Sequence, residues 1–214
     1  MTERFICLVI GYLCGMFQTS YIYGRMHGID IREHGSGNAG TTNALRILGK
    51  KAGIITLVGD CCKCIIAIAT ARLLFGESCR DIIPLLSLYA AAGCILGHNF
   101  PAVLGFRGGK GIAASVGLVL AFDIKIFLIC AVVFFLIFFT THYVSLCSVM
   151  AYITFVLVLI GFGQAGMFGV DTACLYEMYA VAAGLAALAV YRHKANIDRL
   201  LHGKENKTYL KKKK

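Results

Sequence analysis

The sequence predicts an all-α, polytopic transmembrane helix bundle, because apolar residues are in excess, charged residues are scarce and apolar stretches recur at membrane-spanning length. Of the 214 residues, 58% are hydrophobic and 15% are charged, whereas soluble globular chains are about half apolar and about a quarter charged. A chain of this composition lacks the polar residues to cover its own surface, so lipid is its expected surrounding. We expect one integral membrane domain over residues 1–214.

The predicted spans are seven apolar stretches. In chain order they are residues 5–24, 52–75, 82–97, 112–122, 126–141, 146–162 and 178–191. The first stretch is about 20 residues long, roughly 30 Å as a helix, which is enough to cross the hydrocarbon layer. The fourth stretch, 112–122, is short for a span, so a full crossing and a half-helix or re-entrant element both stay open.

The basic residues set the expected orientation. Lys and Arg favour the loops after the first, third and seventh spans, and residues 192–214 carry nine of them against Asp198 and Glu205. Cytoplasmic loops of membrane proteins are enriched in Lys and Arg, so we expect the N-terminus outside and the C-terminus in the cytoplasm. Without the short fourth stretch the count would be six, and the basic C-terminus would lie outside, against its charge.

The net charge of +10 and the basic tail, about 203–214, do not indicate nucleic-acid binding, because no interleaved aromatic residues or reading helix accompany the charge. Beside a membrane span, anionic lipid headgroups explain the tail better. Most of the ten cysteines lie in apolar runs and act as small hydrophobes. For Cys61, Cys62 and Cys64 we expect core packing and no metal site. The first apolar run is long and lacks a small-residue cleavage site, so no cleavable signal peptide is expected.

The first polar segment, residues 36–46, reads SGNAGTTNALR. Small residues let backbone N–H groups approach an oxyanion closely, and a helix N-terminus with Ser and Thr nearby favours anion binding. Asn43 and Arg46 would share a face of a helix that begins there. The alternative is a tight turn with a helix cap, which needs the Gly and Ser or Asn residues but not the Arg.

The second polar segment covers residues 97–101, GHNFP, and 106–111, FRGGKG. Three glycines around Lys110 are typical of a loop that cradles phosphate. The loop is not a Walker A motif, because Leu104 stands where that motif has its first glycine and Gly111 stands where it has Ser or Thr. The hydroxyl that would bind magnesium is therefore missing. A flexible interfacial loop is the alternative.

The third polar segment is residues 192–207, RHKANIDRLLHGKENK. His193 and Asn196 share a face of a predicted helix whose apolar stripe is Ile197, Leu200 and Leu201. Two interpretations stand: the helix presents His193 to a neighbouring site, or it is a basic anchor on lipid headgroups.

Two further features lie in or beside the spans. Asp60 and Lys63 lie three residues apart inside the second span, where an intrahelical ion pair is the preferred explanation. Ser145 begins the sixth span on the predicted side of the three polar segments, where it either lines the site or makes a helix–helix contact.

Together the three segments make the chain resemble the bacterial acyl-phosphate:glycerol-3-phosphate acyltransferases, the PlsY family. The likeness covers nearly the whole chain, with signatures at 36–46, 97–115 and 192–207. The family is described as a seven-span membrane enzyme with all motifs on the cytoplasmic side. His142 stands where the family usually has Arg, which puts one positive charge near the phosphates in doubt. Cys64 stands for a usual Gly, a difference that we expect to alter packing only.

The resemblance implies transfer of an acyl group from acyl phosphate to the 1-hydroxyl of sn-glycerol 3-phosphate. The products are lysophosphatidic acid and inorganic phosphate, in the first step of phospholipid synthesis. It implies a bacterial cytoplasmic membrane location, an active site facing the cytoplasm, no cofactor and no metal. The partners are the two substrates and membrane lipid, without nucleic acid. The oligomeric state is left open, with a monomer included.

The implied roles divide into catalysis and substrate binding. The catalytic residues are His193, Asn196, Ser36 and Arg46. The substrate-binding residues are Asn38, Thr42, Asn43, His98, Asn99, Gly108, Gly109, Lys110, Gly111 and Ser145. Lys110 is expected to hold glycerol 3-phosphate, and direct attack without an acyl-enzyme is preferred. Either His193 or the phosphate of the donor takes the proton.

Two other classes fit part of the pattern. A phosphate or glycerol-phosphate transporter also needs spans, basic groups and glycine-rich loops, but it is expected to place polar groups near the bilayer midplane in inverted repeats. No internal repeat is visible in this sequence. A membrane scaffold with a basic tail leaves the segments around His98, Lys110 and His193 unexplained.

Overall fold

The structure, a computed structural model, describes residues 1–209, and all regular secondary structure in this range is helical, with no β-strand in it. The five C-terminal residues of the predicted tail lie outside the described residues. The helices are α1 (Thr2–Gly15), α2 (Thr19–Met26), α3 (Thr41–Phe75), α4 (Ile83–Asn99), α5 (Ile112–Phe122), α6 (Ile124–Thr141), α7 (Val144–Gln164), α8 (Thr172–Arg192) and α9 (Lys194–Leu201). Short 3₁₀ turns lie at Ile31–Glu33, Arg80–Ile82 and Ala102–Leu104.

Six helical segments of the described chain are long and apolar enough to cross a membrane, with α1 and α2 counted together. The lipid-facing character is clearest on α6, where Leu128, Val132 and Leu136 follow one another at helical spacing and are 55%, 58% and 63% exposed. Leucine and valine on the outside of a bundle need an apolar surrounding. The short helix α5 has the predicted bounds and only 11 residues. Seven crossings, and the orientation of the termini, therefore stay predictions.

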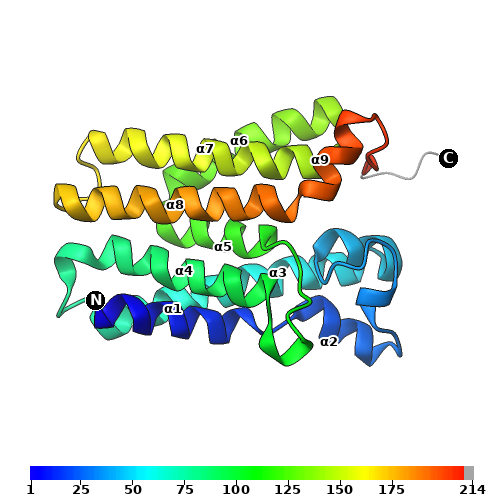
Figure 1. Cartoon of the computed structure of the whole chain (residues 1–214), viewed down its shortest axis with the longest axis horizontal. Helices are drawn as coiled ribbons and strands as arrows, with labels where there is room; N and C mark the ends of the chain where they lie inside the picture. Colours follow the sequence, from blue (N-terminus) through cyan, green and yellow to red (C-terminus); the bar gives the residue numbers. More distant parts are fainter. Residues whose placement is uncertain (210–214) are drawn as a thin grey trace.

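The helices run roughly along one axis in two layers (Figure 1). Helices α1, α3 and α4 form one layer, α6, α7 and α8 form the other, and α5 lies between them with contacts to α3, α4 and α6. The N-terminus lies at one end of the bundle, together with the loops after α3 and α7. Helices α2 and α9 and the start of α3 lie at the opposite end. All three polar segments are thus gathered at one end.

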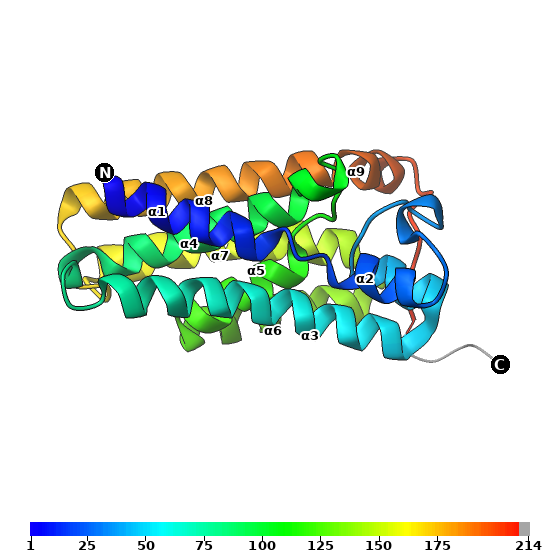
Figure 2. The ribbon, with the colours of Figure 1, turned by 90° about the horizontal axis from the view of Figure 1, so that it is seen from below.

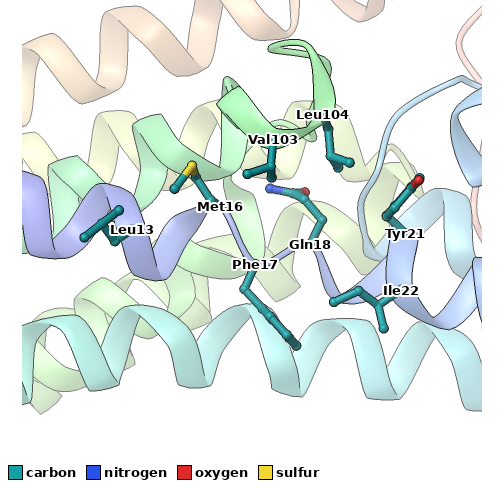
Figure 3. Close-up of a pocket in the computed structure, with 8 residues that line it drawn as sticks. All are labelled: Leu13, Met16, Phe17, Gln18, Tyr21, Ile22, Val103 and Leu104. Carbon is teal, nitrogen blue, oxygen red and sulfur yellow. The ribbon is translucent and has the colours of Figure 1, made fainter.

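The prediction of one unbroken first span is wrong, because the chain leaves the helix between Gly15 and Thr19. Gln18 lies at this break and is 2% exposed. Its side-chain amide donates to the carbonyls of Gly15, at 3.2 Å, and His98, at 3.0 Å. Figure 3 shows Gln18 among apolar neighbours that line a groove of about 370 Å³ beside the break. A polar side chain here supplies hydrogen bonds that the interrupted helix cannot make itself.

Close packing of α1 on α4 fixes the position of the α4 C-terminus. A Cβ atom on Gly11 would lie 1.9 Å from the carbonyl oxygen of Ala90, and one on Gly97 would lie 2.2 Å from that of Tyr12. Glycine therefore lets the two backbones touch, as small residues do in membrane helix pairs. This contact brings His98, at the end of α4, against the break in α1.

Helix α3 begins earlier than the predicted span and runs nearly the full length of the bundle (Figure 2). Its backbone is non-helical at Gly49, with φ at +85°, which separates a short first part, 41–48, from the long remainder. The predicted Asp60–Lys63 pair is confirmed at 2.9 Å. Cys64 is fully buried as expected, but Cys62 is exposed on the outer face of α3, so core packing is wrong for that residue.

Candidate active site

A cavity of about 1220 Å³ opens at the end of the bundle where the polar segments meet. One part of its wall is polar and comes from the start of α3, the loop before α5, and the region from α9 to Thr208. The other part is apolar and comes mainly from α5, α6 and α7. Its residues include Val116, Leu118, Val119, Phe127, Ala131, Phe134, Phe135, Phe138, Ala151 and Phe155. The cavity therefore joins a polar chamber to an apolar one.

Most of the predicted site residues line this single cavity. They are Ser36, Asn38, Thr42, Asn43, Arg46, His98, Lys110, Gly111, Ser145, His193 and Asn196. Asn99, Gly108 and Gly109 do not line it. Asn99 is fully buried, and neither polar atom of its side chain has a partner in the described chain. The three segments are far apart in sequence, so their meeting is a property of the fold.

The first segment is held in shape by Asn43, which is 2% exposed. Its amide group donates to the carbonyls of Ile31, at 3.1 Å, and His34, at 2.9 Å, while its carbonyl oxygen accepts from the backbone of Ser36 at 3.0 Å. The side chain of Asn38 donates to the Ser36 hydroxyl at 3.3 Å. Asn43 thus organises the loop that carries Ser36, and its predicted contact with substrate stays a prediction.

The glycine loop before α5 is pressed against the end of α4. The backbone N–H of Gly109 donates to the His98 carbonyl at 3.1 Å, and a Cβ atom on Gly109 would lie 2.2 Å from His98 Nε2. Arg192 donates to the Gly109 carbonyl at 2.7 Å from the other side. Gly111 has a φ of +80°, which L-residues rarely adopt. These contacts fix the loop and aim Lys110 into the cavity.

Glu205, a carboxylate not among the predicted site residues, joins the third segment to α7. Glu205 Oε1 accepts from Asn196 at 2.6 Å and from Ser145 at 2.9 Å, and Oε2 accepts from Arg199 at 2.7 Å. The Lys110 ammonium in turn donates to the side-chain oxygen of Asn196. The available signal was that Glu205 is one of only two acids among residues 192–214, which carry nine Lys and Arg.

Charges in the chamber are set by burial and by one another. Burial lowers the pKa of Lys110 to about 8, against the opposing effect of Glu205, with further lowering by nearby arginines. Burial, followed by the charge of Lys110, lowers the pKa of His193 to about 4. For the Glu205 carboxyl, burial raises the pKa, but the hydrogen bonds from Asn196, Arg199 and Ser145 bring it below its ordinary value. At neutral pH the chamber therefore holds a charged lysine and a neutral histidine.

The tautomer of His193 follows from its partner. Nδ1 lies 2.8 Å from the carbonyl oxygen of Ala189, and a carbonyl can only accept, so Nδ1 carries the proton. The other ring nitrogen, Nε2, is then a proton acceptor, and it has no hydrogen-bond partner among residues 1–209. His193 is thus arranged as a neutral base at the cavity wall.

The chain after α9 returns across the chamber. The backbone N–H of Thr208 donates to the carbonyl of His142 at 2.9 Å, and Arg46 reaches the Thr208 hydroxyl at 3.5 Å. His142 has a φ of +61° at the end of α6 and does not line the cavity. Its side chain is therefore not part of the chamber wall, and its effect on phosphate binding stays open.

Fold and site define an integral membrane helix bundle with an interfacial chamber suited to phosphate groups, continuous with an apolar arm. The glycerol-3-phosphate acyltransferase family model matches residues 5–203. The chain belongs to this family.

Individual relatives and solved structures match nearly the whole length of this chain. A glycerol-3-phosphate acyltransferase of Clostridioides difficile is 44% identical over 97% of this chain and 96% of its own length. One from Bacillus cytotoxicus is 41% identical over all of this chain and 99% of its own. A crystal structure of PlsY (YgiH), described as an integral membrane glycerol 3-phosphate acyltransferase in its glycerol 3-phosphate form, superposes with a TM-score of 0.82 at 32% identity. The superposition covers 96% of each chain. The lysophosphatidic acid form of PlsY gives 0.80 over 96% of this chain and 95% of that one.

Proposed function

We propose that the protein transfers an acyl group from acyl phosphate to the 1-hydroxyl of sn-glycerol 3-phosphate, giving lysophosphatidic acid and inorganic phosphate. The observation that carries the proposal is the joined cavity: a cationic, glycine-lined chamber opens directly into an apolar arm between α5, α6 and α7. Two phosphate headgroups suit the chamber, and one fatty chain suits the arm. The relatives crystallised with glycerol 3-phosphate and with lysophosphatidic acid support the same substrate and product.

The phosphate of glycerol 3-phosphate is assigned to Lys110 and the loop Gly108–Gly111. Lys110 and Gly111 line the cavity, and the ammonium supplies charge and hydrogen bonds. The Gly109 N–H is bound to the His98 carbonyl, so Gly109 acts by shaping the loop. The acyl-phosphate head is assigned to Ser36, Asn38 and Thr42, with Arg46 beside them. His193 and Asn196, assisted by Ser145, orient the glycerol. Acyl phosphate is already activated, so the transfer needs neither ATP nor a metal for activation.

The transfer is a direct attack. The 1-hydroxyl oxygen of glycerol 3-phosphate forms a bond to the acyl carbonyl carbon, and the bond from that carbon to the phosphate oxygen breaks, releasing phosphate. The hydroxyl proton goes either to Nε2 of His193 or to the phosphate of the donor. The free Nε2 supports the first route. Burial lowers the pKa of His193 to about 4, which keeps the ring neutral but makes it a weaker base, so the donor phosphate stays the alternative acceptor. The ten cysteines offer no better nucleophile, because only Cys130 among the described residues lines the cavity, and it lies in the apolar arm.

We further propose seven crossings, with the N-terminus outside and the active site facing the cytoplasm of a bacterium. The motifs share one end of the bundle, and the basic segments lie at that same end. The test is cysteine labelling of intact cells in a cysteine-depleted background. A cysteine placed at Asn38 should resist a membrane-impermeant reagent until the cells are opened, and labelling in intact cells would reverse the orientation.

The activity is tested with purified protein in detergent. Phosphate release from a long-chain acyl phosphate is measured with and without glycerol 3-phosphate, and the lipid product is identified by mass spectrometry. Release that depends on glycerol 3-phosphate and yields lysophosphatidic acid supports the proposal. Equal release without the acceptor contradicts it, and faster acylation from acyl-CoA contradicts the donor. Uptake of glycerol 3-phosphate into proteoliposomes in the absence of acyl donor would favour transport instead.

A further inference from the structure

A buried ion pair lies within the bundle, beside the candidate site. Asp60 and Lys63, on successive turns of α3, are 1% and 5% exposed, and their charged atoms lie 2.9 Å apart. Thr19, the first residue of α2, donates its hydroxyl to Asp60 at 3.1 Å. Neither charged residue has a part in the proposed acyl transfer. Ionisable residues inside membrane bundles are costly, and they usually serve function.

Lys63 forms hydrogen bonds to the chain at the break between α1 and α2. Its ammonium donates to the carbonyl of Phe17 at 2.7 Å and to that of Gly15 at 3.3 Å. The Gly15 carbonyl, at the end of α1, also accepts from Gln18, whereas the Phe17 carbonyl, in the break itself, takes Lys63 as its donor. The ion pair thus joins α3 to the break in the first span.

The same ammonium reaches His98, whose Nδ1 lies 2.7 Å from Lys63 Nζ. An ammonium has no lone pair and can only donate, so Nδ1 must accept and the ring proton must be on Nε2. His98 is 2% exposed and lies at the end of α4. Lys63 therefore selects one of the two neutral tautomers of this histidine.

His98 then touches the glycine loop through two groups. Its carbonyl accepts from the Gly109 backbone at 3.1 Å, and its Nε2 lies where a Cβ atom on Gly109 would be only 2.2 Å away. A ring turned to the other tautomer would present an unprotonated nitrogen to this backbone. The tautomer of His98 thus sets whether an N–H or a lone pair faces the loop next to Lys110.

Stability alone does not account for the pair. Asp60 Oδ2 is buried and has no hydrogen-bond partner within residues 1–209. Replacing a buried ion pair by apolar residues of similar volume is often neutral or stabilising. Burying the Asp60–Lys63 pair costs desolvation free energy and leaves one carboxylate oxygen without a partner. The pair is therefore better explained by the positions in which it holds its neighbours.

We propose that Asp60 and Lys63 are positioning residues for acyl transfer: they fix His98 as the Nε2–H tautomer, and His98 seats the Gly108–Gly111 loop for phosphate. The proposal rests on the proposed function in one respect, that this loop binds the phosphate of glycerol 3-phosphate. Asp60 orients the Lys63 ammonium, and Lys63 orients the ring. Asp60 also lines the cavity, whereas Lys63 does not, and both act on the loop through His98.

The first test determines the tautomer of His98 by NMR and does not depend on enzyme activity. Protein labelled with ¹⁵N-histidine is compared with H98Q to assign the His98 ring signals by NMR. The wild type should show an unprotonated Nδ1 and a protonated Nε2, and K63M should lose this pattern. R4M is the matched control, because Arg4 pairs with Glu177 at 2.7 Å at the opposite end of the bundle. An unchanged His98 spectrum in K63M overturns the proposal.

The second test measures phosphate binding by the loop through the KM for glycerol 3-phosphate. K63M should raise KM for glycerol 3-phosphate about tenfold, about 1.4 kcal/mol in affinity, with a smaller change in kcat. K63R should recover part of the loss, and R4M should leave both constants unchanged. The apolar double variant D60L/K63M separates positioning from folding, since it removes both charges together. It should retain the wild-type Tm and keep the raised KM.

The outcomes are distinguishable. A wild-type KM in D60L/K63M would show that the pair has no positioning role and would overturn the proposal. If the wild-type protein fails to acylate glycerol 3-phosphate, the proposed function fails, while the tautomer measurement still decides whether Lys63 fixes His98. If K63M does not fold, the double variant carries both measurements.

Discussion

The side-chain amide of Asn196 donates a 2.6 Å hydrogen bond to the Glu205 carboxylate, so a residue of α9 at the cavity wall is held by the chain that follows it. The same carboxylate binds Ser145 and Arg199. One acid therefore ties α7, α9 and the following segment together, next to Lys110. Neutralising it should disturb the chamber at several points at once.

We expect E205Q to lower kcat/KM for glycerol 3-phosphate by about tenfold, because unpairing one or two buried hydrogen-bonding groups costs about 1–3 kcal/mol. The Tm should also fall, since Arg199 and Ser145 lose an anionic acceptor. D198N is the control: Asp198 lies on the same helix as Arg199 and is exposed. Steady-state kinetics and a detergent thermal-shift assay check both expectations. Equal behaviour of E205Q and D198N would remove Glu205 from the site.

The glycine loop gives a second prediction. G109A should raise KM for glycerol 3-phosphate about tenfold or more, because the added Cβ would lie 2.2 Å from His98 Nε2 and 2.6 Å from the Ala39 carbonyl. Turnover at saturating substrate should change less. G184A is the matched control, since Gly184 lies within α8 and a Cβ there meets nothing within 4 Å. A KM in G109A equal to that in G184A would contradict the assigned role of the loop.

The sequence predicts a bundle of membrane-spanning helices correctly, because apolar stretches of span length are rarely compatible with another fold class. The predicted spans agree with α4, α5 and α6 to within two residues at either end. Hydropathy could not predict the break at Gln18, because the break depends on residues far along the chain. Lys63 donates to the Phe17 carbonyl, and Gln18 donates to the His98 carbonyl, in place of helical hydrogen bonds. Tertiary contacts can override local pattern in this way.

The site was predictable where one segment carried its own chemistry and not where the contact was long-range. Lys110 stands among glycines in the sequence, and the structure brings it to the cavity wall. Glu205 is indistinguishable from a solvated tail residue until the chain is seen to return to Asn196. Asn43 looked like a ligand for phosphate, but both polar atoms of its side chain bind the backbone of residues 31–36. Sequence position alone did not show that Asn43 shapes the loop, and its contact with substrate stays a prediction.

The ionisation of Lys110 predicts an alkaline limb in the pH profile. Burial lowers its pKa to about 8, so the ammonium is lost as pH rises through that value and phosphate binding weakens. The phosphate itself stays a dianion over this range, because its second pKa is near 6. We expect kcat/KM for glycerol 3-phosphate to fall above about pH 8. K110R should remove the limb, since arginine stays charged, even if its overall activity is lower.

The acid side of the pH profile and a His193 variant test which group accepts the proton. If His193 is the base, kcat at saturating substrates should stay high down to well below pH 6.5, because the pKa of His193 is lowered to about 4. H193Q should then cut kcat by about 100-fold or more, with a smaller change in KM. A kcat close to wild type in H193Q would assign the proton to the donor phosphate and leave His193 as a binding residue.

The apolar arm predicts a change in acyl-chain preference. Ala151 lines the arm from α7, so A151F should fill part of it and exclude long chains. The ratio of kcat/KM for a 16-carbon over a 10-carbon acyl phosphate should fall by about tenfold, a difference of about 1.4 kcal/mol. I153F is the matched control, because Ile153 lies two residues further on α7, is 42% exposed and does not line the cavity. The two variants add the same ring to the same helix, so only the direction of the side chain differs. A chain-length ratio that changes equally in both would mean that the acyl group lies elsewhere, and the apolar arm would then need another occupant.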